Sequence, residues 1–479
     1  MGAPVNGVEL VSALGLEIGV AVLMLIVLLA GLVMPAGDKR RVGVLAAIGL
    51  VILLGLSWRA EAGAELFNGA FVQDELALFA KRLFIVATLI GVLASLPLQA
   101  AAFSRRATEY YLAILASLLG MLALASARDL ILLFVAFELM SIPLYYLAGF
   151  LKREPEAVEA ALKFFLVGTL SSAVLVYGLS FMYGIAGTTD IRGVARALTT
   201  AHPMLVLGML LALGGLGFKI AAFPFHMWVP DTYEAASTPF VAWLSVAPKA
   251  AGFVVIFRLY LEGVGDRVLF WVPAATGLAA VTIIGGNLMA LPQQNLKRLL
   301  AYSGVAHIGY MLVGFAAVSA NGAAMMLFYL VAYLFGNMGA FLVVEAVAQA
   351  EGSEAIAAYR GLAQRSPILA LSMLLFLLSL GGIPFVAGFW AKLYVFWAAA
   401  EQGLYWLVLV GAVLTVVALF YYLLVAKRMY IDAPDRRDPI PVAPLLSFCI
   451  FVCVLGVVLA GIYPKPLVIA ALRAAAPLF

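Results

Sequence analysis

Long runs of hydrophobic residues follow one another along nearly the whole chain, separated by short polar segments. Most runs reach the roughly 18 residues that allow a helix to cross a bilayer. None shows the alternating polarity over about 10 residues that is typical of a membrane barrel strand. The pattern therefore predicts an all-α polytopic membrane protein with about fourteen transmembrane helices, at residues 8–34, 42–58, 76–103, 109–127, 129–150, 161–186, 203–228, 239–262, 268–291, 300–319, 321–348, 366–400, 404–428 and 442–462.

The composition indicates the same class of protein. Of the 479 residues, 65% are hydrophobic and 11% are charged, whereas a soluble domain has about 25% charged residues. Basic and aromatic residues do not gather in the patches that nucleic-acid binding requires. The expected surroundings are therefore the lipid bilayer and other membrane proteins, with no nucleic acid.

The sequence carries no motif for a metal, nucleotide, flavin or haem. Cys449 and Cys453 lie one helical turn apart in the last long hydrophobic run, with no histidine or carboxylate nearby in the sequence. We interpret them as packed thiols. The chain itself is expected to hold no metal and no cofactor.

The basic residues are distributed unequally between the two sets of connecting segments, which indicates the orientation in the membrane. The richer set, expected in the cytoplasm, holds Lys39, Arg40, Arg41, Arg105, Arg106, Lys152, Arg153, Lys297, Arg298, Arg360, Arg365, Lys427, Arg428, Arg436 and Arg437. The other set holds Arg59, Arg128, Arg192, Arg196, Arg267, Lys465 and Arg473. Because the number of predicted spans is even, both termini are expected on the outer side.

Two short matches indicate an internal repeat. The segment "GGLGF" at Gly214 matches "GGIPF" at Gly381, 167 residues later, and "LAGF" at Leu147 matches "LVGF" at Leu312, 165 residues later. The repeated unit would hold five helices, so its second copy must be inverted in the membrane. Inverted repeats with interrupted helices are typical of secondary transporters.

A proline marks the predicted interruption in each repeat: Pro224 within 203–228 and Pro384 within 366–400. Proline removes an intrahelical hydrogen bond and clashes with the preceding turn. The predicted organisation is an N-terminal three-helix segment at 1–108, a first five-helix repeat at 109–262, a second, inverted repeat at 268–428, and a C-terminal helix and tail at 429–479.

Several charged residues lie within the predicted spans. Glu138, Lys219, Lys249 and Lys392 lie well inside hydrophobic runs, and Lys163 lies nearer to a loop. Each costs at least about 2.5–3.5 kcal/mol at a helix centre unless it is paired or hydrated. We interpret these residues as functional. The alternatives are a structural acid linking two helices for Glu138, and lysines that snorkel to the interface, above all Lys163.

Two histidines are further candidates. His226, four residues before Pro230, either takes up protons or has a capping or hydrogen-bonding role. His307, in "YSGVAHIGYMLVGF", either relays protons, for which its ordinary pKa is suited, or is a neutral core residue.

The chemistry that these residue types share is proton exchange. Burial disfavours the charged form of an amine, whereas a carboxylate within about 4–6 Å favours it. A movement of Glu138 toward or away from Lys219 would therefore make the amine hold or release a proton.

The residues around these lysines resemble a known family. The stretch "KIAAFPFHMWVPDTYEAASTPFVAWLSVAPKAAGF", from Lys219 to Phe253, is similar to the antiporter-like membrane subunits of respiratory complex I, an NADH:quinone oxidoreductase. Within it, "VPDTYE" followed by "TPFVAWLSVAPKAAGF" resembles the subunit N type. The segments "FELMSIPLYYLAGF", "YSGVAHIGYMLVG" and "GIPFVAGFWAKLYVF" fit the same type, so the resemblance covers most of the chain. One departure is Ala235-Ala236, where the family pattern has a glycine in the turn.

The resemblance implies a proton-translocating subunit in the membrane arm of complex I, in the bacterial plasma membrane. It implies that Glu138 modulates Lys219 in a first half-channel and that Lys249 connects the halves. It also implies that His307 lies in the central hydrophilic line and that Lys392 serves the second half-channel. Quinone, flavin and iron–sulfur clusters are expected in other subunits. The implied partners are the K-, M-, L-, J- and A-type subunits.

Other functions stay open at this point. One is a subunit of a cation/proton antiporter, and another is a subunit of a related complex that takes electrons from ferredoxin. A third is a structural scaffold whose buried charges only hold helices together.

Overall fold

The computed structural model of the chain describes residues 13–479 except 36–37, 99–100, 151–154, 198–202 and 264–268. Three of the basic residues used to predict the orientation, Lys152, Arg153 and Arg267, lie outside the described residues. Contacts divide the chain into two compact units. Unit 1 comprises Met1–Ile220, Ala247–Ala274 and Leu472–Phe479, and unit 2 comprises Ala221–Val246 and Ala275–Ala471.

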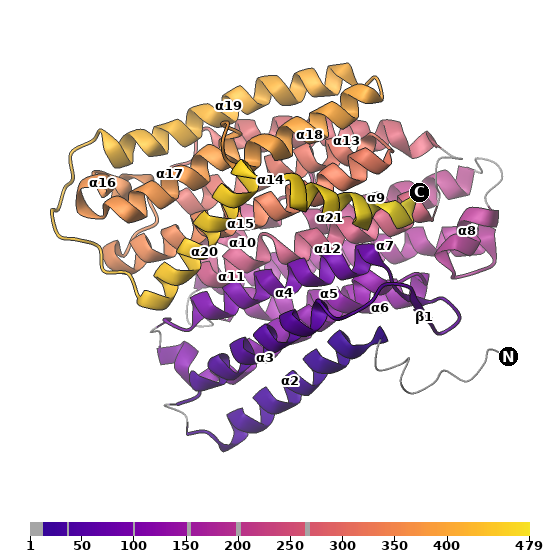
Figure 1. Ribbon diagram of the computed structural model, residues 1–479, viewed down its shortest axis with the longest axis horizontal. Coiled ribbons are helices and arrows are strands. Elements are labelled where there is room, and N and C mark those ends of the chain that lie inside the picture. Colours follow the sequence, from indigo (N-terminus) through magenta and orange to yellow (C-terminus); the bar gives the residue numbers. More distant parts are fainter. Residues whose placement is uncertain (1–12, 36–37, 99–100, 151–154, 198–202, 264–268) are drawn as a thin grey trace. The chain divides into compact units, whose positions relative to one another are not determined.

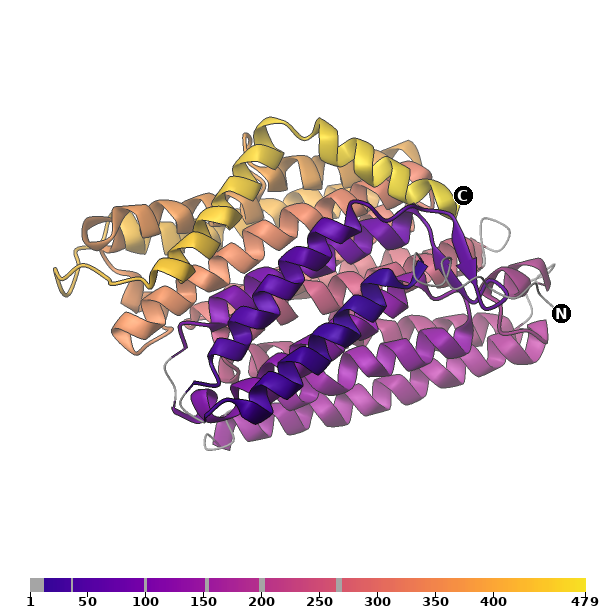
Figure 2. The same cartoon turned by 60° about the horizontal axis from the view of Figure 1, so that its bottom comes forward.

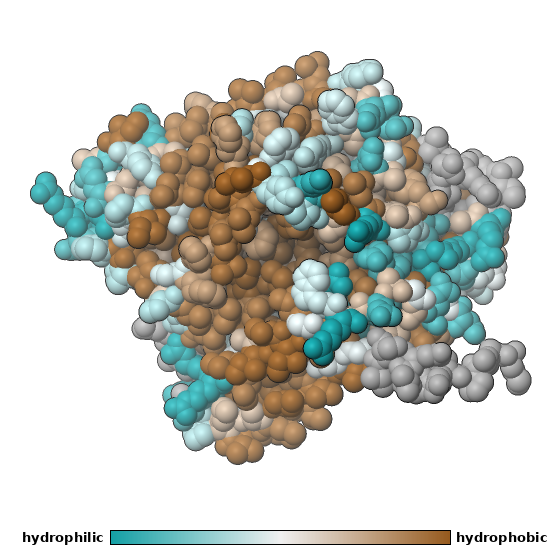
Figure 3. All heavy atoms as spheres, viewed as in Figure 1, coloured by the Kyte–Doolittle hydropathy of each residue, from teal (hydrophilic) through white to brown (hydrophobic). Residues whose placement is uncertain are grey.

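Helices account for nearly all regular structure (Figure 1). Among the described residues, twelve helices are long and apolar enough to cross a membrane, and two shorter apolar helices, Arg41–Ser57 and Pro367–Gly381, lie where further spans were predicted. Hydrophobic residues cover much of the face drawn in Figure 3. Such extensive exposed apolar surface marks contact with a membrane, so the predicted all-α membrane protein is confirmed.

Unit 1 consists mainly of the N-terminal helices. Its elements are α2 (Gly15–Val33), α3 (Arg41–Ser57), β1 (Ala64–Leu66), β2 (Phe71–Gln73), α4 (Glu75–Ser95), α5 (Ala101–Ser126), α6 (Leu130–Ala148), α7 (Pro155–Ala186), α8 (Ile191–Ala197), α9 (Pro203–Ile220), α12 (Ala247–Ile256), the π-helical η1 (Phe257–Glu262), and the 3-10 helices η3 (Leu269–Trp271) and η5 (Ala476–Leu478). The strands form an antiparallel hairpin in which Ala64 pairs with Gln73.

The helix α12 lies at the centre of unit 1. Every one of its residues is buried, and it packs against α4, α5 and α9. Around it, α2 packs on α3 and α5, α6 packs on α5 and α7, and α7 packs on α9, with the long helices side by side in Figure 2. Charged residues of α12 therefore face protein and not lipid.

Unit 2 contains the remaining helices. They are α10 (Trp228–Ala235), α11 (Thr238–Leu244), α13 (Val272–Ala290), α14 (Leu296–Ala316), α15 (Ala320–Glu351), the 3-10 helix η4 (Ile356–Tyr359), α16 (Leu362–Arg365), α17 (Pro367–Gly381), α18 (Ala387–Glu401), α19 (Tyr405–Tyr430), α20 (Pro444–Ile462) and α21 (Lys465–Ala475). The first residues of α13 and the last of α21 belong to unit 1.

The core of unit 2 is formed by α14 and α15. All residues of α14 except Arg298 are buried. The longer α15 packs against α11, α14, α17, α18 and α20. The residues of α14, including His307, are thus removed from lipid.

Polar side chains fix where the helices of both units begin. Asp74 caps α4, Asp129 caps α6, Asn295 caps α14 and Ser319 caps α15, each accepting a hydrogen bond from a backbone N–H of the first turn. Such caps satisfy donors that have no partner within the helix. The caps at Asp129 and Asn295 thus fix where the helices that carry Glu138 and His307 begin.

The helix interruption predicted at Pro224 is present. The helix α9 ends at Ile220, Ala221 has a positive φ of 65°, the Phe223-Pro224 peptide bond is cis, and α10 begins only at Trp228. Regular helical structure therefore ends at Ile220, one residue after Lys219.

The second predicted interruption, at Pro384, is present as well. The helix α17 ends at Gly381, Gly382 takes a positive φ of 80°, and α18 begins at Ala387. The amide of Ile383 bonds back to the carbonyl of Leu378, which closes the end of α17 in the manner of a glycine C-cap.

A third interruption was not predicted. Residues 239–262, expected as one helix, are divided into α11, α12 and η1, with a turn at Ser245 and Val246. Pro248 explains the turn, because it has no N–H to donate to the carbonyl of Leu244. Predicted loops also contain structure that the hydropathy pattern does not indicate: the hairpin β1–β2, α8 and α21.

Candidate functional site

Unit 1 brings Lys219 together with residues of α6. The Lys219 side chain is 3% exposed, and its Nζ donates a hydrogen bond to Ser141 Oγ at 2.8 Å. Ser141 in turn donates to the carbonyl of Phe137 at 2.6 Å, and the Phe137 ring lies 5.4 Å from the Lys219 Nζ. The amine is thus held by a hydroxyl on another helix.

Glu138 is the charged neighbour of this lysine. Its carboxylate acts on Lys219 through charge. Its Oε1 is buried and has no hydrogen-bond partner among the described residues. Tyr145, one turn from Ser141 on the same face of α6, is also buried. The Lys219 site therefore combines an amine with a carboxylate and two hydroxyl groups of α6.

Close backbone approaches position Lys219. A Cβ added at Gly215 would lie 2.9 Å from the Ser171 carbonyl of α7, and Ser171 Oγ donates to the Gly215 carbonyl at 2.7 Å. A Cβ at Gly252 of α12 would lie 2.8 Å from a methyl of Ile220. Small residues therefore let α9 lie close to both neighbouring helices.

Lys249 lies in unit 1 as well. It is 1% exposed and lies on α12, which packs against α9. The residues that follow it, Ala250, Ala251 and Gly252, are small and buried. Two of the predicted lysines are therefore buried on adjacent helices, of which α12 is buried at every residue.

In unit 2, His307 is hydrogen-bonded to tyrosines. Its Nδ1 lies 2.8 Å from Tyr329 Oη, and its Nε2 lies 3.4 Å from Tyr422 Oη. Tyr422 Oη also forms a hydrogen bond with Ser303. The imidazole thus links hydroxyl groups of α15 and α19.

A line of polar groups leads from these tyrosines toward Lys392. The rings of Tyr422 and Tyr421 are 4.6 Å apart, Tyr421 Oη donates to Asn287 Oδ1 at 3.1 Å, and Asn287 Nδ2 donates to Tyr310 Oη at 3.3 Å. The Tyr310 ring lies 4.6 Å from Lys392 Nζ. His307 and Lys392 are therefore connected through side chains that hydropathy alone does not reveal.

The helix interruption supplies the acceptor for Lys392. Its Nζ donates to the carbonyl of Gly381, the last residue of α17, at 3.4 Å. A Cβ at Gly382 would lie 3.0 Å from Lys392 Cδ, in addition to its positive φ. A glycine is required here both by the backbone conformation and by the lysine side chain.

The two accessory candidates differ in their surroundings. His226 lies between α9 and α10, is 4% exposed, and stacks on Phe223 with 4.9 Å between the ring centres. Lys163 is exposed on α7 and forms an ion pair with Glu159, one turn away on the same helix, at 2.8 Å. The structure thus places Lys163 at a surface, as snorkelling predicts.

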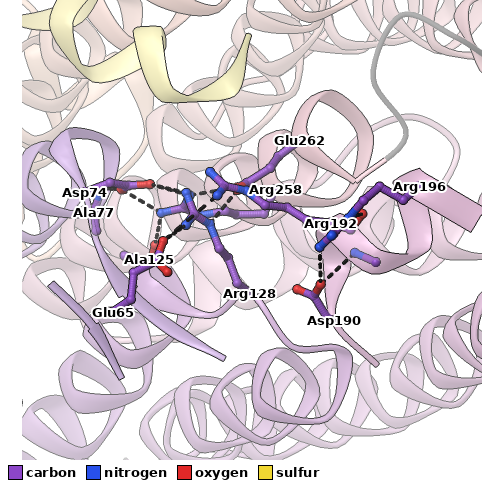
Figure 4. A network of polar contacts seen from close by, with 11 residues as sticks. Glu65, Asp74, Ala77, Ala125, Arg128, Asp190, Arg192, Arg196, Arg258 and Glu262 are labelled. Atoms are coloured by element: carbon purple, nitrogen blue, oxygen red, sulfur yellow. Dashed lines mark hydrogen bonds and ion pairs between the residues drawn. The ribbon is translucent and has the colours of Figure 1, made fainter. Parts of the chain in front are cut away.

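A cluster of buried charges at one end of unit 1 was not identified from the sequence (Figure 4). Arg258, which is fully buried, contacts both oxygens of Asp74 at 2.6 and 2.8 Å and Glu262 at 2.9 Å. Arg128 contacts Asp74 at 3.2 Å and Glu262 at 2.5 Å. We call Asp74, Arg128, Arg258 and Glu262 the outer-loop ion cluster, because it joins segments predicted to lie near the outer side.

The cluster changes the acidity of its central carboxyl group. Burial by itself raises the pKa of Asp74, but the charge and hydrogen bonds of Arg258, the Ala77 N–H and the charge of Arg128 together hold that pKa below its ordinary value of 3.8. Asp74 is therefore an ionised structural group at neutral pH.

Further buried charges were also overlooked, namely Glu17, Lys81, Lys297 and Glu345. A signal was present for three of these residues and for Arg258 of the cluster, since all four fall within predicted spans: Glu17, Lys81, Arg258 and Glu345. Each lies within three turns of a predicted span end, where a side chain that reaches the interface is the usual explanation.

Titratable and hydroxyl-bearing groups dominate both sites. Among the residues that the structure describes, no group of three or more histidine, cysteine or carboxylate side chains is placed to hold a metal ion. What both arrangements offer chemically is acceptance, storage and transfer of protons in places shielded from lipid.

Comparison with known proteins adds an independent observation. Residues 127–418 match the family model described as the transmembrane region of NADH:quinone oxidoreductase and Mrp antiporter. The chain is 40% identical over 469 residues to NADH-quinone oxidoreductase subunit N of Moorella thermoacetica, covering 97% of this chain and 98% of that protein.

Solved structures with the same fold include two kinds of complex. A chain of respiratory complex I from Thermus thermophilus superimposes with a TM-score of 0.81 at 32% identity, covering 95% of this chain and 98% of that one. A chain of the Mrp complex from a Dietzia species gives a TM-score of 0.87 at 22% identity, covering 99% and 98%. Because the sequence identity of this second match is low, it supports a shared fold and nothing further.

Proposed function

The chain belongs to the subunit N family of NADH-quinone oxidoreductases, and from this premise we propose that it translocates protons in the membrane arm of such a complex through its buried Glu, Lys and His residues. The subunit is antiporter-like in fold and spans the membrane many times. Its energy comes from quinone reduction in other subunits, where the redox cofactors reside.

The observation that carries the proposal is the surroundings of Lys219. A lysine at an interrupted helix, 3% exposed, donates to one hydroxyl at 2.8 Å and experiences the charge of Glu138. Because the amine is buried, its charge depends on these neighbours. A displacement of Glu138 or of α9 would change whether the amine holds a proton.

The second half of the path is supported by the polar line in unit 2. His307 exchanges protons with the Tyr329 and Tyr422 hydroxyls, and Lys392 holds a proton against the Gly381 carbonyl. Lys249, buried on α12, is assigned to the same proton path. His226 remains an accessory group, and Lys163 is left out of the path because it is exposed and paired with Glu159.

The remaining assignments follow from membership of the family. The expected partners are the K-, M-, L-, J- and A-type subunits, and the expected location is the bacterial plasma membrane with both termini outside. We assign no redox step to this chain, so it acts as the translocating part of the enzyme.

Lys219→Met tests the proposal in the assembled complex. The variant is introduced into the native complex, and vesicle acidification and quinone reduction are measured together, with assembly followed on native gels. We expect proton translocation to fall on the order of 100-fold, which is the lower range of what a positioned proton-transferring side chain contributes.

Lys427→Met is the matched control, since Lys427 is exposed near the end of α19. It makes the same chemical change without touching a buried site, so translocation should stay at the wild-type rate. An assembled Lys219→Met complex that translocates protons normally would contradict the proposal.

The fold shared with the Mrp complex favours one second candidate, a subunit of a cation/proton antiporter. Purification from native membranes separates the two. We expect quinone-reducing partner subunits to co-purify. Sodium-dependent proton exchange by a complex without quinone reductase activity would favour the antiporter instead.

A further inference from the structure

A buried acid and a buried lysine form a pair in unit 1, away from the Lys219 site. Lys81 on α4 is 0% exposed, and its Nζ lies 2.7 Å from Glu17 Oε1 on α2. The Glu17 side chain is 9% exposed. The pair therefore repeats, between different helices, the combination of carboxylate and amine found at Glu138 and Lys219.

The surroundings of the pair are closed but polar on one side. Lys81 Nζ donates to Gln73 Oε1 at 3.3 Å and lies 5.0 Å from the centre of the Phe71 ring. Asp74 and Arg258 of the outer-loop ion cluster also act on Lys81 through their charges. A small apolar cluster of Ala13, just before α2, and Leu66 and Phe71 of the hairpin includes the ring that Lys81 contacts.

The pair differs from the outer-loop ion cluster because one of its carboxylate oxygens is available to bind a proton. In the cluster, Asp74 Oδ1 accepts from Arg258 and the Ala77 N–H, and Asp74 Oδ2 contacts Arg258 and Arg128. Protonating Asp74 would break several charge-assisted contacts.

Glu17, in contrast, contacts one amine through Oε1. Its Oε2 is buried and has no hydrogen-bond partner among the described residues. A buried carboxylate oxygen without a partner costs free energy, and protonation lowers that cost because burial disfavours the charged form of a carboxyl group. An incoming proton thus has a place on Glu17 that the cluster does not offer.

We propose that Glu17 and Lys81 form a further proton-binding site of this subunit, in addition to the two lysine sites. The charged pair, Glu17 carboxylate beside Lys81 ammonium, takes up one proton on Oε2. The product is a neutral carboxylic acid beside the ammonium, and release of the same proton restores the starting pair.

Uptake adds one positive charge next to Asp74 and Arg258, so proton binding at the pair is coupled electrostatically to the outer-loop ion cluster. The exposed Glu65 and the partly exposed Arg192 connect that cluster to the surface, since Arg128 contacts Glu65 at 3.0 Å and Arg192 contacts Glu262 at 2.8 Å (Figure 4). This inference rests on the proposed function, because it treats the chain as a proton carrier.

The competing explanation is that the pair only joins α2 to α4. A double variant that carries both Glu17→Met and Lys81→Met distinguishes the two explanations. Replacing a buried ion pair by apolar residues of similar volume is often neutral or stabilising, so a purely structural pair can be replaced without loss. A proton-binding site cannot, because methionine binds no proton.

The experiment uses the whole complex in native membranes. Wild type, the double variant, Lys219→Met and the exposed control Glu75→Gln on α4 are compared for assembly, quinone reduction and vesicle acidification. We expect the assembled double variant to lose translocation as severely as Lys219→Met does, while Glu75→Gln keeps the wild-type rate.

Wild-type translocation by the double variant, alongside a defective Lys219→Met complex, overturns this inference and leaves the proposed function standing. Unimpaired Lys219→Met overturns the proposed function itself.

If the double variant fails to assemble, Glu17→Gln gives the answer, because glutamine preserves the size and a contact with Lys81. In that variant the protonated-carboxyl infrared band of Glu17 should vanish, and the pH profile of translocation should change. A profile and a carboxyl spectrum identical to wild type would overturn the proposal.

Discussion

Three buried lysines of the chain are held by three different kinds of acceptor. Lys219 contacts the Ser141 hydroxyl, and Lys392 contacts the Gly381 carbonyl that α17 leaves free at its end. Lys81 contacts a carboxylate directly. Lysines that look equivalent in the sequence therefore have chemically different acceptors in the structure.

Asp74→Asn is expected to lower the stability of the protein at neutral pH and to remove part of its sensitivity to acid. Removing one member of a buried charge cluster costs about 3–5 kcal/mol, because the remaining charges lose their partner. The folded-state pKa of Asp74 lies below its ordinary value of 3.8, so its stabilising contribution is complete above that value. It is lost as the pH falls through the lower, folded-state pKa.

The measurement is the unfolding temperature of the purified complex between pH 7 and pH 3. The wild type should lose stability at the acidic end, whereas Asp74→Asn should start lower and change less. An acid response equal in the two proteins would show that Asp74 is not the responsible group. Asp38→Asn, at an exposed surface ion pair, serves as the control with little expected effect.

At the scale of elements, close contacts between helices place the reactive residues. The helix α6 carries Glu138 and Ser141, and it lies against α5 at Gly120. A Cβ at Gly120 would lie 2.3 Å from the backbone nitrogen of Met140, which lies between Glu138 and Ser141 in the sequence. Because that atom belongs to the backbone, the contact cannot be relieved by a side-chain rotation, and α6 itself would have to move.

Gly120→Ala is therefore expected to destabilise the protein and to impair translocation, at a cost of about 1–3 kcal/mol for forced overpacking. The same substitution at Gly184 on α7, where no atom lies within 4 Å of the added Cβ, should be neutral or stabilise the helix by about 0.5–1 kcal/mol. Unfolding temperature and vesicle acidification measure the two effects. Equal behaviour of the two variants would contradict the importance of the α5–α6 contact.

At the scale of the whole molecule, the distribution of charge predicts how the chain lies in the membrane. The loop after α19 contains Arg436 and Arg437, both exposed, and belongs to the richly basic set. The segment around the hairpin β1–β2 belongs to the other set. The positive-inside tendency therefore predicts a cytoplasmic loop after α19 and an outer hairpin.

Cysteine labelling tests this orientation with little background, since both native cysteines, Cys449 and Cys453, are buried. Ala62→Cys and Arg437→Cys introduce exposed thiols on the two predicted sides. A membrane-impermeant maleimide should label Ala62→Cys in intact cells and Arg437→Cys only after the membrane is opened. The reverse pattern would invert the proposed topology.

The features that could be predicted are those encoded locally. Hydrophobic run length predicted the membrane helices, and Pro224 and Pro384 predicted two interruptions that the structure contains. The interruption before Pro248 was encoded just as locally and was overlooked, because the surrounding run is uniformly hydrophobic. The repeat boundaries remain a prediction.

Other features depend on segments far apart in the chain. Arg258 and Asp74 are 184 residues apart, and Lys219 and Ser141 are 78 residues apart. Tyrosines in hydrophobic runs read as ordinary core residues, so nothing in the pattern indicates that Tyr422 lies beside His307.

The sequence by itself determined that this chain is a bundle of membrane helices with costly charges inside it, because the transfer of hydrophobic and charged groups into lipid depends on each segment alone. Only the tertiary structure decided which side chains contact those charged groups. Hydrogen bonds and ion pairs act over a few ångströms in space, and folding alone brings Glu17 to Lys81, Ser141 to Lys219, and the tyrosines to His307.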